Sequence, residues 1–150
     1  MRYITFALGK GRLAEKTLEM FEQIGITCEE MKDKKTRKLI FVNEELGLRF
    51  FLAKGPDVPT YVEYGAADIG IVGRDTILEE GRKIYEVLDL GIGKCRFIVA
   101  GLPEHNPFEK VGHVKIGTKY PHVAKNYFLE KGIDAEFIKI DGSVELAPLL

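Results

Sequence analysis

Short apolar runs and helix-like stretches alternate along the chain. Residues 3–8 are a run of strand formers that stops at a glycine turn. The apolar positions of residues 13–24 then recur at helical spacing until Gly25 supplies a stop. The pattern therefore begins with a strand, a glycine turn and a helix.

The same alternation continues to the end of the sequence. Strands at 39–42 and 48–53, separated by a turn at 43–47, predict a hairpin, and Asp57 is positioned to cap a helix that runs to about residue 64. The other expected elements are strands at 67–72, 84–90, 95–100, 114–117 and 135–140, and helices at 75–80 and 120–131. This order predicts an α/β fold with mixed, mostly parallel sheets.

The glycines at residues 91–94 indicate a boundary between two lobes. We expect a first lobe at residues 1–92 and a second at residues 93–150. The second lobe is small, and the sequence ends inside an expected helix that Ser143 would cap. The sequence thus predicts a chain that is truncated at its C-terminus.

Composition and charge narrow the class of protein. The chain is 45% hydrophobic and 30% charged, and its 22 basic and 23 acidic residues give a net charge of −1, which argues against a nucleic-acid partner. The sequence contains no apolar run long enough for a membrane span and no secretory signal, so we expect a cytoplasmic protein. Cys28 and Cys95 are far apart and the histidines are scattered, which predicts reduced thiols in or near the core and no metal site.

The glycine turn after the first strand is the first candidate site. Backbone N–H groups at the start of a helix favour an anion, and Gly11 lets a ligand approach the backbone. Lys10 and Arg12 add positive charge. A tight turn with two surface cations is the alternative, and the sequence leaves both open.

Further cations stand at strand ends. Residues 32–38 carry five basic side chains against one acidic residue, which is typical of a solvated loop. Arg37 differs because it lies at the entry to a strand, and Lys54 follows the end of the next one. Open α/β sheets bind ligands beyond the carboxyl ends of their strands. The pattern therefore predicts a phosphorylated small molecule held between the lobes.

Two aspartates also follow strands. Asp75 and Asp141 could bind Mg²⁺ or a ribose hydroxyl, or they could cap the helices that follow, and both interpretations stay open. No Ser/His/Asp or Cys/His arrangement can be assembled from the sequence, so a covalent mechanism is not expected.

Six blocks of the sequence resemble the ATP phosphoribosyltransferase family. They cover nearly the whole chain in the order of the family, although Gly9 stands where the family usually has proline. The blocks lie at residues 7–13 (ALGKGRL), 57–62 (DVPTYV), 65–75 (GAADIGIVGRD), 95–101 (CRFIVAG), 118–128 (TKYPHVAKNYF) and 142–149 (GSVELAPL).

The resemblance implies a two-lobed fold like that of type II periplasmic binding proteins. It implies transfer of phosphoribosyl from 5-phosphoribosyl 1-diphosphate (PRPP) to N1 of ATP, with Mg²⁺ bound to the diphosphate. This reaction is the first step of histidine biosynthesis. The residues that match the family's catalytic positions are Lys10, Arg37 and Lys54. Those that match substrate-binding positions are Lys10, Gly11, Arg12, Asp68, Gly73, Asp75, Ser143, Glu145 and Ala147.

The resemblance also implies partners. The blocks are closer to the short form of the family, which forms homo-oligomers and depends on a regulatory subunit resembling histidyl-tRNA synthetase. The family continues beyond Ala-Pro-Leu-Leu into a PRPP-binding loop and then returns to complete the first lobe. The resemblance therefore implies that the first lobe is incomplete without this returning segment and that residues 1–150 alone are inactive. The alternative is a two-lobed binding module without catalysis, either a solute-binding protein or an effector-sensing domain.

Overall fold

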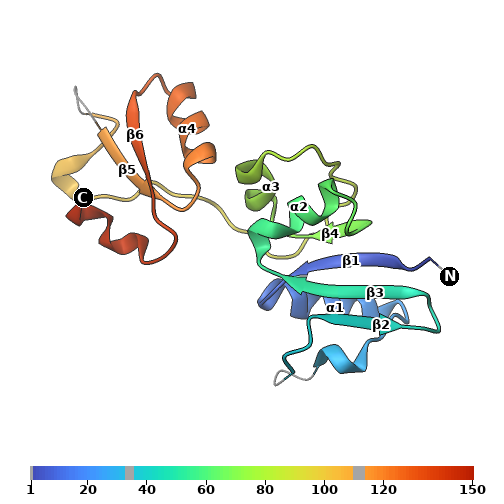
Figure 1. Cartoon of the computed structure of the whole chain (residues 1–150). Coiled ribbons are helices and arrows are strands. Elements are labelled where there is room, and N and C mark those ends of the chain that lie inside the picture. The colour runs from blue at the N-terminus through green and yellow to red at the C-terminus, as the bar shows by residue number, and fades with distance from the viewer. Residues whose placement is uncertain (1, 33–35, 110–113) are drawn as a thin grey trace. The chain divides into compact units, whose positions relative to one another are not determined.

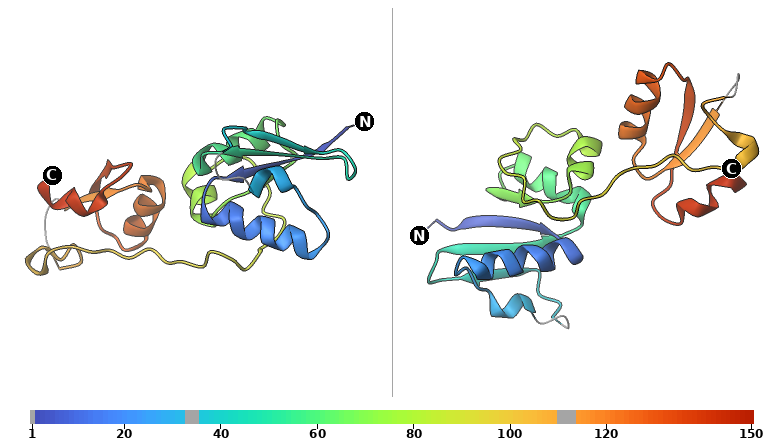
Figure 2. Two further views of the ribbon diagram at one scale, coloured as in Figure 1. Left: turned by 90° about the horizontal axis from the view of Figure 1, so that it is seen from below. Right: turned by 180° about the vertical axis from the view of Figure 1, so that it is seen from behind.

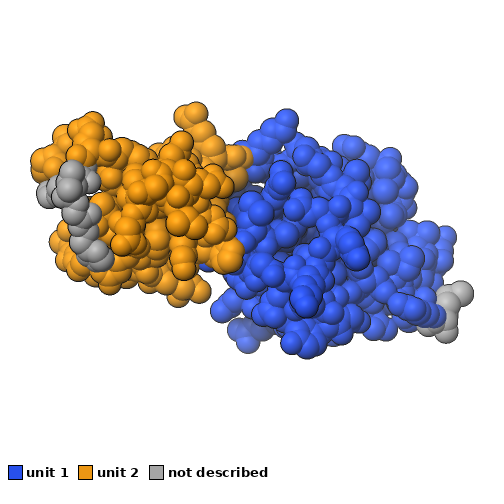
Figure 3. Space-filling view, turned by 90° about the horizontal axis from the view of Figure 1, so that it is seen from above, with its two compact units in different colours: residues 1–94 blue, residues 95–150 orange. Residues whose placement is uncertain are grey.

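The computed structural model describes residues 2–32, 36–109 and 114–150. The chain divides into two compact units, Met1–Lys94 and Cys95–Leu150, which are coloured separately in Figure 3. The boundary expected from the sequence, between residues 92 and 93, lies close to this division. Each unit has its own sheet, as the sequence pattern of alternating strands and helices requires.

The first unit contains a four-stranded sheet in the order β2-β3-β1-β4 (Figure 1). Its strands are β1 (Ile4–Gly9), β2 (Ile40–Asn43), β3 (Leu48–Ala53) and β4 (Ile69–Ile71). β1 runs parallel to both β3 and β4, whereas β2 and β3 form an antiparallel hairpin. The predictions of a hairpin and of a mixed, mostly parallel sheet are confirmed.

Helices cover both faces of this sheet. They are α1 (Arg12–Gln23), α2 (Val58–Glu63) and α3 (Arg74–Glu80), together with the 3₁₀ turns η1 (Glu29–Lys32) and η2 (Gly55–Asp57). α1 lies along one face, as Figure 2 shows, where the rings of Phe6, Phe21 and Phe50 pack with centroids 5.3 to 5.9 Å apart. A buried phenylalanine contributes about 1.5–3 kcal/mol, so this cluster is a main source of the stability of the unit.

The opposite face has a smaller cover. Ala7, Ala53, Val58 and Ala67 form a buried cluster there, under the short helix α2. α2 begins at Val58 as predicted, but Asp57 makes no side-chain capping hydrogen bond because it already closes the preceding 3₁₀ turn. The small side chains let α2 approach the sheet closely.

The second unit contains two parallel strands. β5 (Val114–Thr118) and β6 (Ala135–Lys139) are connected by α4 (Pro121–Glu130), with the 3₁₀ helices η3 (Pro103–His105) and η4 (Val144–Leu149) on either side in sequence. Phe128 of α4 is 2% exposed, and its ring packs against those of Phe108 and Phe137. The order strand, helix, strand is the unit that the spacing of residues 114–140 predicts.

Two predicted strands do not form. Residues 84–90 and 95–100 have no strand structure, and Tyr85 and Val87 are 95% and 91% exposed. A strand needs a neighbour to receive its backbone hydrogen bonds, and the described part of the chain supplies none to these segments. Their apolar composition favours a strand, but neither segment forms one in this structure.

The helix predicted at the end of the chain is also different. Residues 144–149 form a 3₁₀ helix that contains Pro148, which cannot donate a helical hydrogen bond. Ser143 has a left-handed conformation (φ 49°) and makes no side-chain capping hydrogen bond. The prediction that Ser143 caps an α-helix is wrong.

The cysteines meet the sequence expectation only in part. Both are free. Cys28 packs against the core of the first unit, and burial raises the pKa of its thiol, whereas Cys95 is exposed. Among the described residues, none of the helices has the length and apolar character that crossing a bilayer requires.

Candidate functional site

The candidate site of the first unit lies at one edge of its sheet. Because β1, β3 and β4 are parallel, the turns that follow them leave the sheet on the same side. β2 runs the opposite way, so the residues that precede it reach that same side. We call this side the carboxyl edge.

The glycine turn connects β1 to α1 at the carboxyl edge. Gly9 is the buried last residue of β1, and the N–H of Lys10 donates to the carbonyl oxygen of Ala53 at 3.0 Å. Gly11 precedes α1 with a φ of 105°, a conformation that side chains rarely adopt, although the space around it is open. Arg12 is the first residue of α1. The turn therefore requires glycine at position 11 for its backbone conformation.

A second turn runs beside the first. Lys54 follows β3 directly, and a Cβ atom on Gly9 would lie 3.4 Å from the Cα of Gly55. This close approach brings the Lys10 turn and the Lys54 turn together. Within residues 2–32, 36–109 and 114–150, no carboxylate forms an ion pair with Lys10, Arg12 or Lys54, and all three are exposed.

Arg37 approaches this region from the hairpin. The N–H of Leu52 donates to the carbonyl of Leu39 at 3.0 Å, so pairing of the hairpin extends beyond the first residue of β2. The described pairing ends there, and Arg37 comes two residues before Leu39. The neighbouring basic positions 34 and 35 lie outside the described residues.

Gly73 and Asp75 belong to the turn after β4. Gly73 precedes α3, and a Cβ atom there would lie 2.1 Å from Oδ1 of Asp75. The carboxylate of Asp75 therefore folds back over Gly73, and no larger residue fits without moving it. Gly73 is the N-cap residue of α3, so this helix begins without a side-chain capping hydrogen bond, and Asp75 is in its first turn. The structure brings this turn to the same edge as Lys10 and Lys54.

Asp68 lies elsewhere. It precedes β4, at the amino end of the parallel strands. Its Oδ2 accepts the backbone N–H of Thr5 and its Oδ1 accepts the guanidinium of Arg2, both at 2.8 Å. These two bonds, the backbone one first, hold the pKa of the Asp68 carboxyl below its ordinary value. The structure does not bring Asp68 together with the cations of the carboxyl edge.

The remaining predicted residues are in the second unit. Ser143 and Glu145 are exposed and follow the carboxyl end of β6, where Asp141 also lies, 4.0 Å from the ammonium of Lys139. Ala147 packs on β5, because a Cβ atom on Gly117 would be only 2.6 Å from its own Cβ. Ala147 therefore has a packing role within the second unit.

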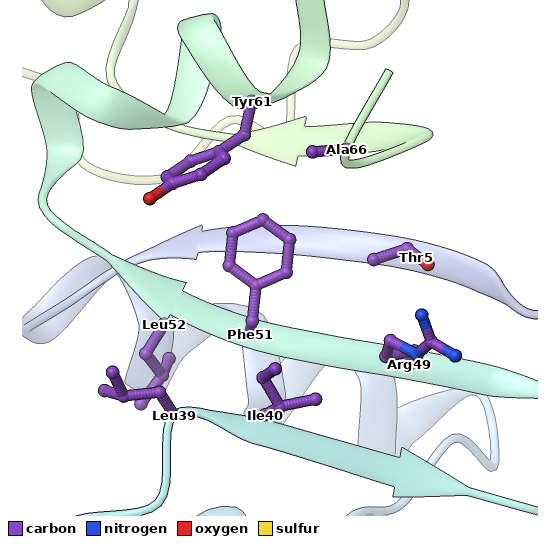
Figure 4. Close-up of a pocket in the computed structure, with 8 residues that line it drawn as sticks. All are labelled: Thr5, Leu39, Ile40, Arg49, Phe51, Leu52, Tyr61 and Ala66. Carbon is purple, nitrogen blue, oxygen red and sulfur yellow. The ribbon is translucent and has the colours of Figure 1, made fainter. Parts of the chain in front are cut away.

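A groove on the face of the first sheet was not predicted from the sequence. It has a volume of about 320 Å³ and lies between α2 and β2, with the ring of Tyr61 standing over Phe51 and with Arg49 at one end (Figure 4). None of the predicted site residues lines it. The close approach of Gly55 to Gly9 was missed as well, although the glycine directly after a strand was a usable signal.

The described residues do not hold a group of three or more His, Cys, Asp or Glu side chains that could bind a metal ion. At the carboxyl edge, Asp57 lies in the 3₁₀ turn after β3 and Asp75 lies in the first turn of α3. Such an edge can bind an anion through lysine, arginine and backbone N–H groups, and it offers at most isolated carboxylates to a cation.

The fold and this edge define the chain as an α/β protein whose parallel strands end in turns suited to phosphate groups. Residues 54–150 match the family described as "HisG: ATP phosphoribosyltransferase". An ATP phosphoribosyltransferase of Lachnospira eligens is 66% identical over the whole chain, which covers 70% of that relative. Its counterpart in Lachnoclostridium phytofermentans is 64% identical, again over the whole chain and 71% of the relative.

A solved structure agrees with these relatives. The ATP phosphoribosyl transferase (HisG:HisZ) complex from Thermotoga maritima contains a chain that is 28% identical, with a TM-score of 0.68. The match covers 97% of the present chain and 68% of that one. The chain belongs to the ATP phosphoribosyltransferase family.

Proposed function

We propose that this chain acts in the transfer of phosphoribosyl from PRPP to N1 of ATP, which yields phosphoribosyl-ATP and diphosphate in the first step of histidine biosynthesis. The observation that carries the proposal is the convergence of the Lys10 and Lys54 turns through the Gly9–Gly55 approach, in a chain of this family. The transfer needs no nucleophile from the protein, because a nitrogen of the substrate attacks the ribose carbon. Catalysis then consists of positioning and of charge stabilisation.

The cations have distinct roles in this proposal. Lys10 and Arg12 bind phosphate oxygens beside the backbone of Gly11, where the start of α1 adds a favourable dipole. Arg37 and Lys54 stabilise the charge that develops on the departing diphosphate. Their exposure in the described structure suits a site that exchanges charged substrates with solvent.

Other residues shape the site. Gly73 and Asp75 border the nucleotide in this proposal. The carboxylate of Asp75 occupies the space that a side chain at position 73 would need, so this position must be glycine. In the second unit, Ser143 and Glu145 begin the segment that leads to PRPP, and Ala147 anchors that segment on β5. A direct contact between Asp68 and the nucleotide is not part of the proposal.

We also propose a two-lobed fold of the type II periplasmic binding kind. In the complete enzyme, chain beyond residue 150 would supply the PRPP loop and return to the first lobe. The exposed apolar segments 84–90 and 95–100 support this idea, because they have strand-forming sequences without partners. Residues 1–150 alone would then be inactive.

Mg²⁺ fits the edge only as an ion carried by substrate. Mg²⁺ prefers about six oxygen ligands and commonly takes most of them from phosphates and water. Asp75 is the residue of the edge that could add a protein oxygen. When bound, the ion would neutralise the diphosphate, while Arg37 and Lys54 of the protein act on the same charge.

Partners follow from the same family relation. The Thermotoga maritima structure is a complex of HisG with HisZ. We propose that this chain likewise works as a homo-oligomer with a regulatory subunit resembling histidyl-tRNA synthetase. A binding module without catalysis is not favoured, because the family match carries an enzyme name and spans both units.

The proposal is tested by removing the two cations assigned to the leaving group. In a chain of the length of its relatives, Arg37→Ala and Lys54→Ala should each cost about 1.5–3 kcal/mol of transition-state stabilisation, the range for a charge-assisted contact. Formation of phosphoribosyl-ATP, followed by absorbance with ATP, PRPP and Mg²⁺ present, measures the loss.

The matched control is Lys16→Ala, which removes an exposed lysine from the middle of α1. This variant should keep the wild-type turnover, and the melting temperatures of all three variants should barely differ from wild type. Wild-type turnover in both Arg37→Ala and Lys54→Ala would refute the assignment.

A further inference from the structure

The carboxylate of Asp68 continues the pairing between β4 and β1 beyond the end of β4. The two strands pair as Phe6 with Ile69 and onward, so the preceding pair is Thr5 with Asp68. The N–H of Asp68 donates to the carbonyl of Thr5 at 2.9 Å, and Oδ2 of Asp68 accepts the N–H of Thr5 at 2.8 Å. One residue therefore satisfies both backbone groups of Thr5.

These bonds are a large part of what holds β4. The strand has three residues, all paired to β1, and it lies at the outer position of the sheet order (Figure 1). Thr5 is 7% exposed, so its N–H would have little access to water if the carboxylate were removed. An unsatisfied buried N–H costs about 1–3 kcal/mol, which β4 could avoid by shifting or detaching.

The position of Asp68 excludes contact with a ligand at the carboxyl edge. Gly73 is five positions after Asp68, and a strand rises about 3.3 Å per residue, so along an extended backbone the two lie roughly 16 Å apart. A carboxylate spans only a few ångströms. Any effect of Asp68 on a ligand at the carboxyl edge must therefore pass through the backbone of β4.

We propose that Asp68 is a positioning residue, which locks β4 to β1 and thereby aligns the turn of residues 73–75 with the glycine turn of residues 9–11. The inference rests on the proposed function, since it assumes that ATP binds at the carboxyl edge. Val72 alone separates β4 from Gly73, so a displacement of the strand is carried directly into that turn.

The test compares two substitutions of Asp68 in the full-length enzyme. Asp68→Asn keeps a side-chain oxygen that can accept the N–H of Thr5, whereas Asp68→Ala removes it. Asp68→Ala should raise KM for ATP by at least about tenfold, because small misplacements of binding groups are costly. It should also speed the exchange of the amides of Thr76 and Ile77, which donate to the carbonyl of Gly73. Asp68→Asn should stay within about threefold of wild type in both readouts.

Phe41→Leu is the matched control for a general loss of stability. It trims a buried ring on β2, a strand that pairs with β3 and not with β1 or β4. This control should leave KM for ATP and both amides unchanged. Asp68→Ser, whose hydroxyl is too short to reach both partners, takes the place of the alanine variant if that variant does not fold.

Each other outcome overturns the proposal. An asparagine variant as impaired as the alanine variant would mean that the hydrogen bond from Thr5 is not what the site requires of this residue. An unchanged KM in Asp68→Ala, or an equal rise in Phe41→Leu, would mean that Asp68 contributes only to folding. The exchange of Thr76 and Ile77 is measured without substrate, so it separates failure of this inference from failure of the proposed function.

Discussion

Strand β4 and the segment of residues 84–100 differ in a way that their sequences do not suggest. β4 has the sequence Ile-Gly-Ile, with a glycine that disfavours strands, and it is nevertheless a strand. Residues 84–90 and 95–100 are rich in Ile, Val, Tyr and Phe, and they have no strand structure. The difference lies in the neighbours: β4 pairs with β1 and is bound through Asp68, whereas none of the described strands pairs with the other two segments.

Strand propensity is thus a property of a site as much as of a sequence. The favourable term for β-branched and aromatic residues comes from packing against cross-strand neighbours, and it vanishes when those neighbours are missing. The beginning of the segment of residues 84–100 contacts the rest of the first unit. The N–H of Lys83 donates to Glu63, and Arg74 forms an ion pair with Glu86. Residues 84–100 are bound at their start and unpaired along their length.

The largest expected effect comes from supplying the missing neighbour. In a chain extended to the length of its relatives, the amides of residues 84–90 and 95–100 should be protected from hydrogen exchange by at least about a hundredfold more than in residues 1–150, as new ladder bonds form. The extended chain should also form phosphoribosyl-ATP and bind PRPP, whereas residues 1–150 should do neither at millimolar PRPP.

The amides of β1 and β3 provide the internal control, because their ladder is already complete in residues 1–150. Their protection should change little. Equal exchange of residues 84–100 in the two chains would show that the unpaired state is intrinsic. Turnover by residues 1–150 would refute the proposal that the PRPP loop lies beyond them.

The regular part of the fold could be predicted because local signals and tertiary partners agree there. The glycine turn at residues 9–11, the hairpin and the strand–helix–strand order of residues 114–139 all follow from periodicity and turn residues. The wrong strands at 84–100 and the wrong cap at Ser143 share one cause. A single sequence indicates what a segment favours, and it does not indicate which edge or which backbone conformation the rest of the molecule offers.

The candidate site shows the same limit. The strand-end rule brought Lys10, Lys54 and Gly73 to one edge, because parallel strands share their polarity. Arg37 precedes the antiparallel strand β2 and so lies on the side of the sheet where the parallel strands end, which the hairpin pattern already implied. Asp68 was assigned to the nucleotide by resemblance alone. Its bonds to Thr5 and Arg2 depend on pairing between distant residues, which no local motif encodes.

A smaller effect is expected from weakening the pairing of β4 deliberately. A Cβ atom on Gly70 would lie 2.8 Å from methyl groups of both Val58 and Val62, so Gly70→Val should push α2 away from β4. Overpacking of this kind costs about 1–3 kcal/mol, and β4 should then exchange its amides as residues 84–90 do. Urea unfolding and amide exchange of residues 69–71 measure the two consequences.

Relief of the clash supplies the control. Gly70→Ala combined with Val62→Ala removes one of the two close methyl groups, and it should recover part of the stability that Gly70→Ala loses alone. If Gly70→Val kept wild-type stability, the close packing of α2 would not be what holds β4 in place, and the contrast with residues 84–100 would need another cause.

The smallest expected effect is a pH dependence of stability that comes from the carboxylate of Asp68, the residue before β4. The pKa of Asp68 is lowered in the folded protein, first by the N–H of Thr5 and then by Arg2. The unfolded chain therefore binds a proton more readily than the folded one at acidic pH, and the stability that Asp68 contributes is complete above its ordinary pKa of 3.8. That stability is lost as the pH falls through the lower, folded value.

Urea midpoints of the first unit at pH 5 and pH 3 measure this linkage. Between pH 5 and pH 3, the urea midpoint of wild type should fall further than that of Asp68→Asn, which cannot titrate at this position. Arg2→Gln should lose an intermediate amount, because the bond from Thr5 is the larger cause and persists. The side chain of Arg2 is 88% exposed, so salt should screen its share, and wild type in high salt should approach Arg2→Gln. An identical pH dependence in wild type and Asp68→Asn would show that the charge does not strengthen the hold of β1 on β4, and that the neutral hydrogen bond from Thr5 suffices.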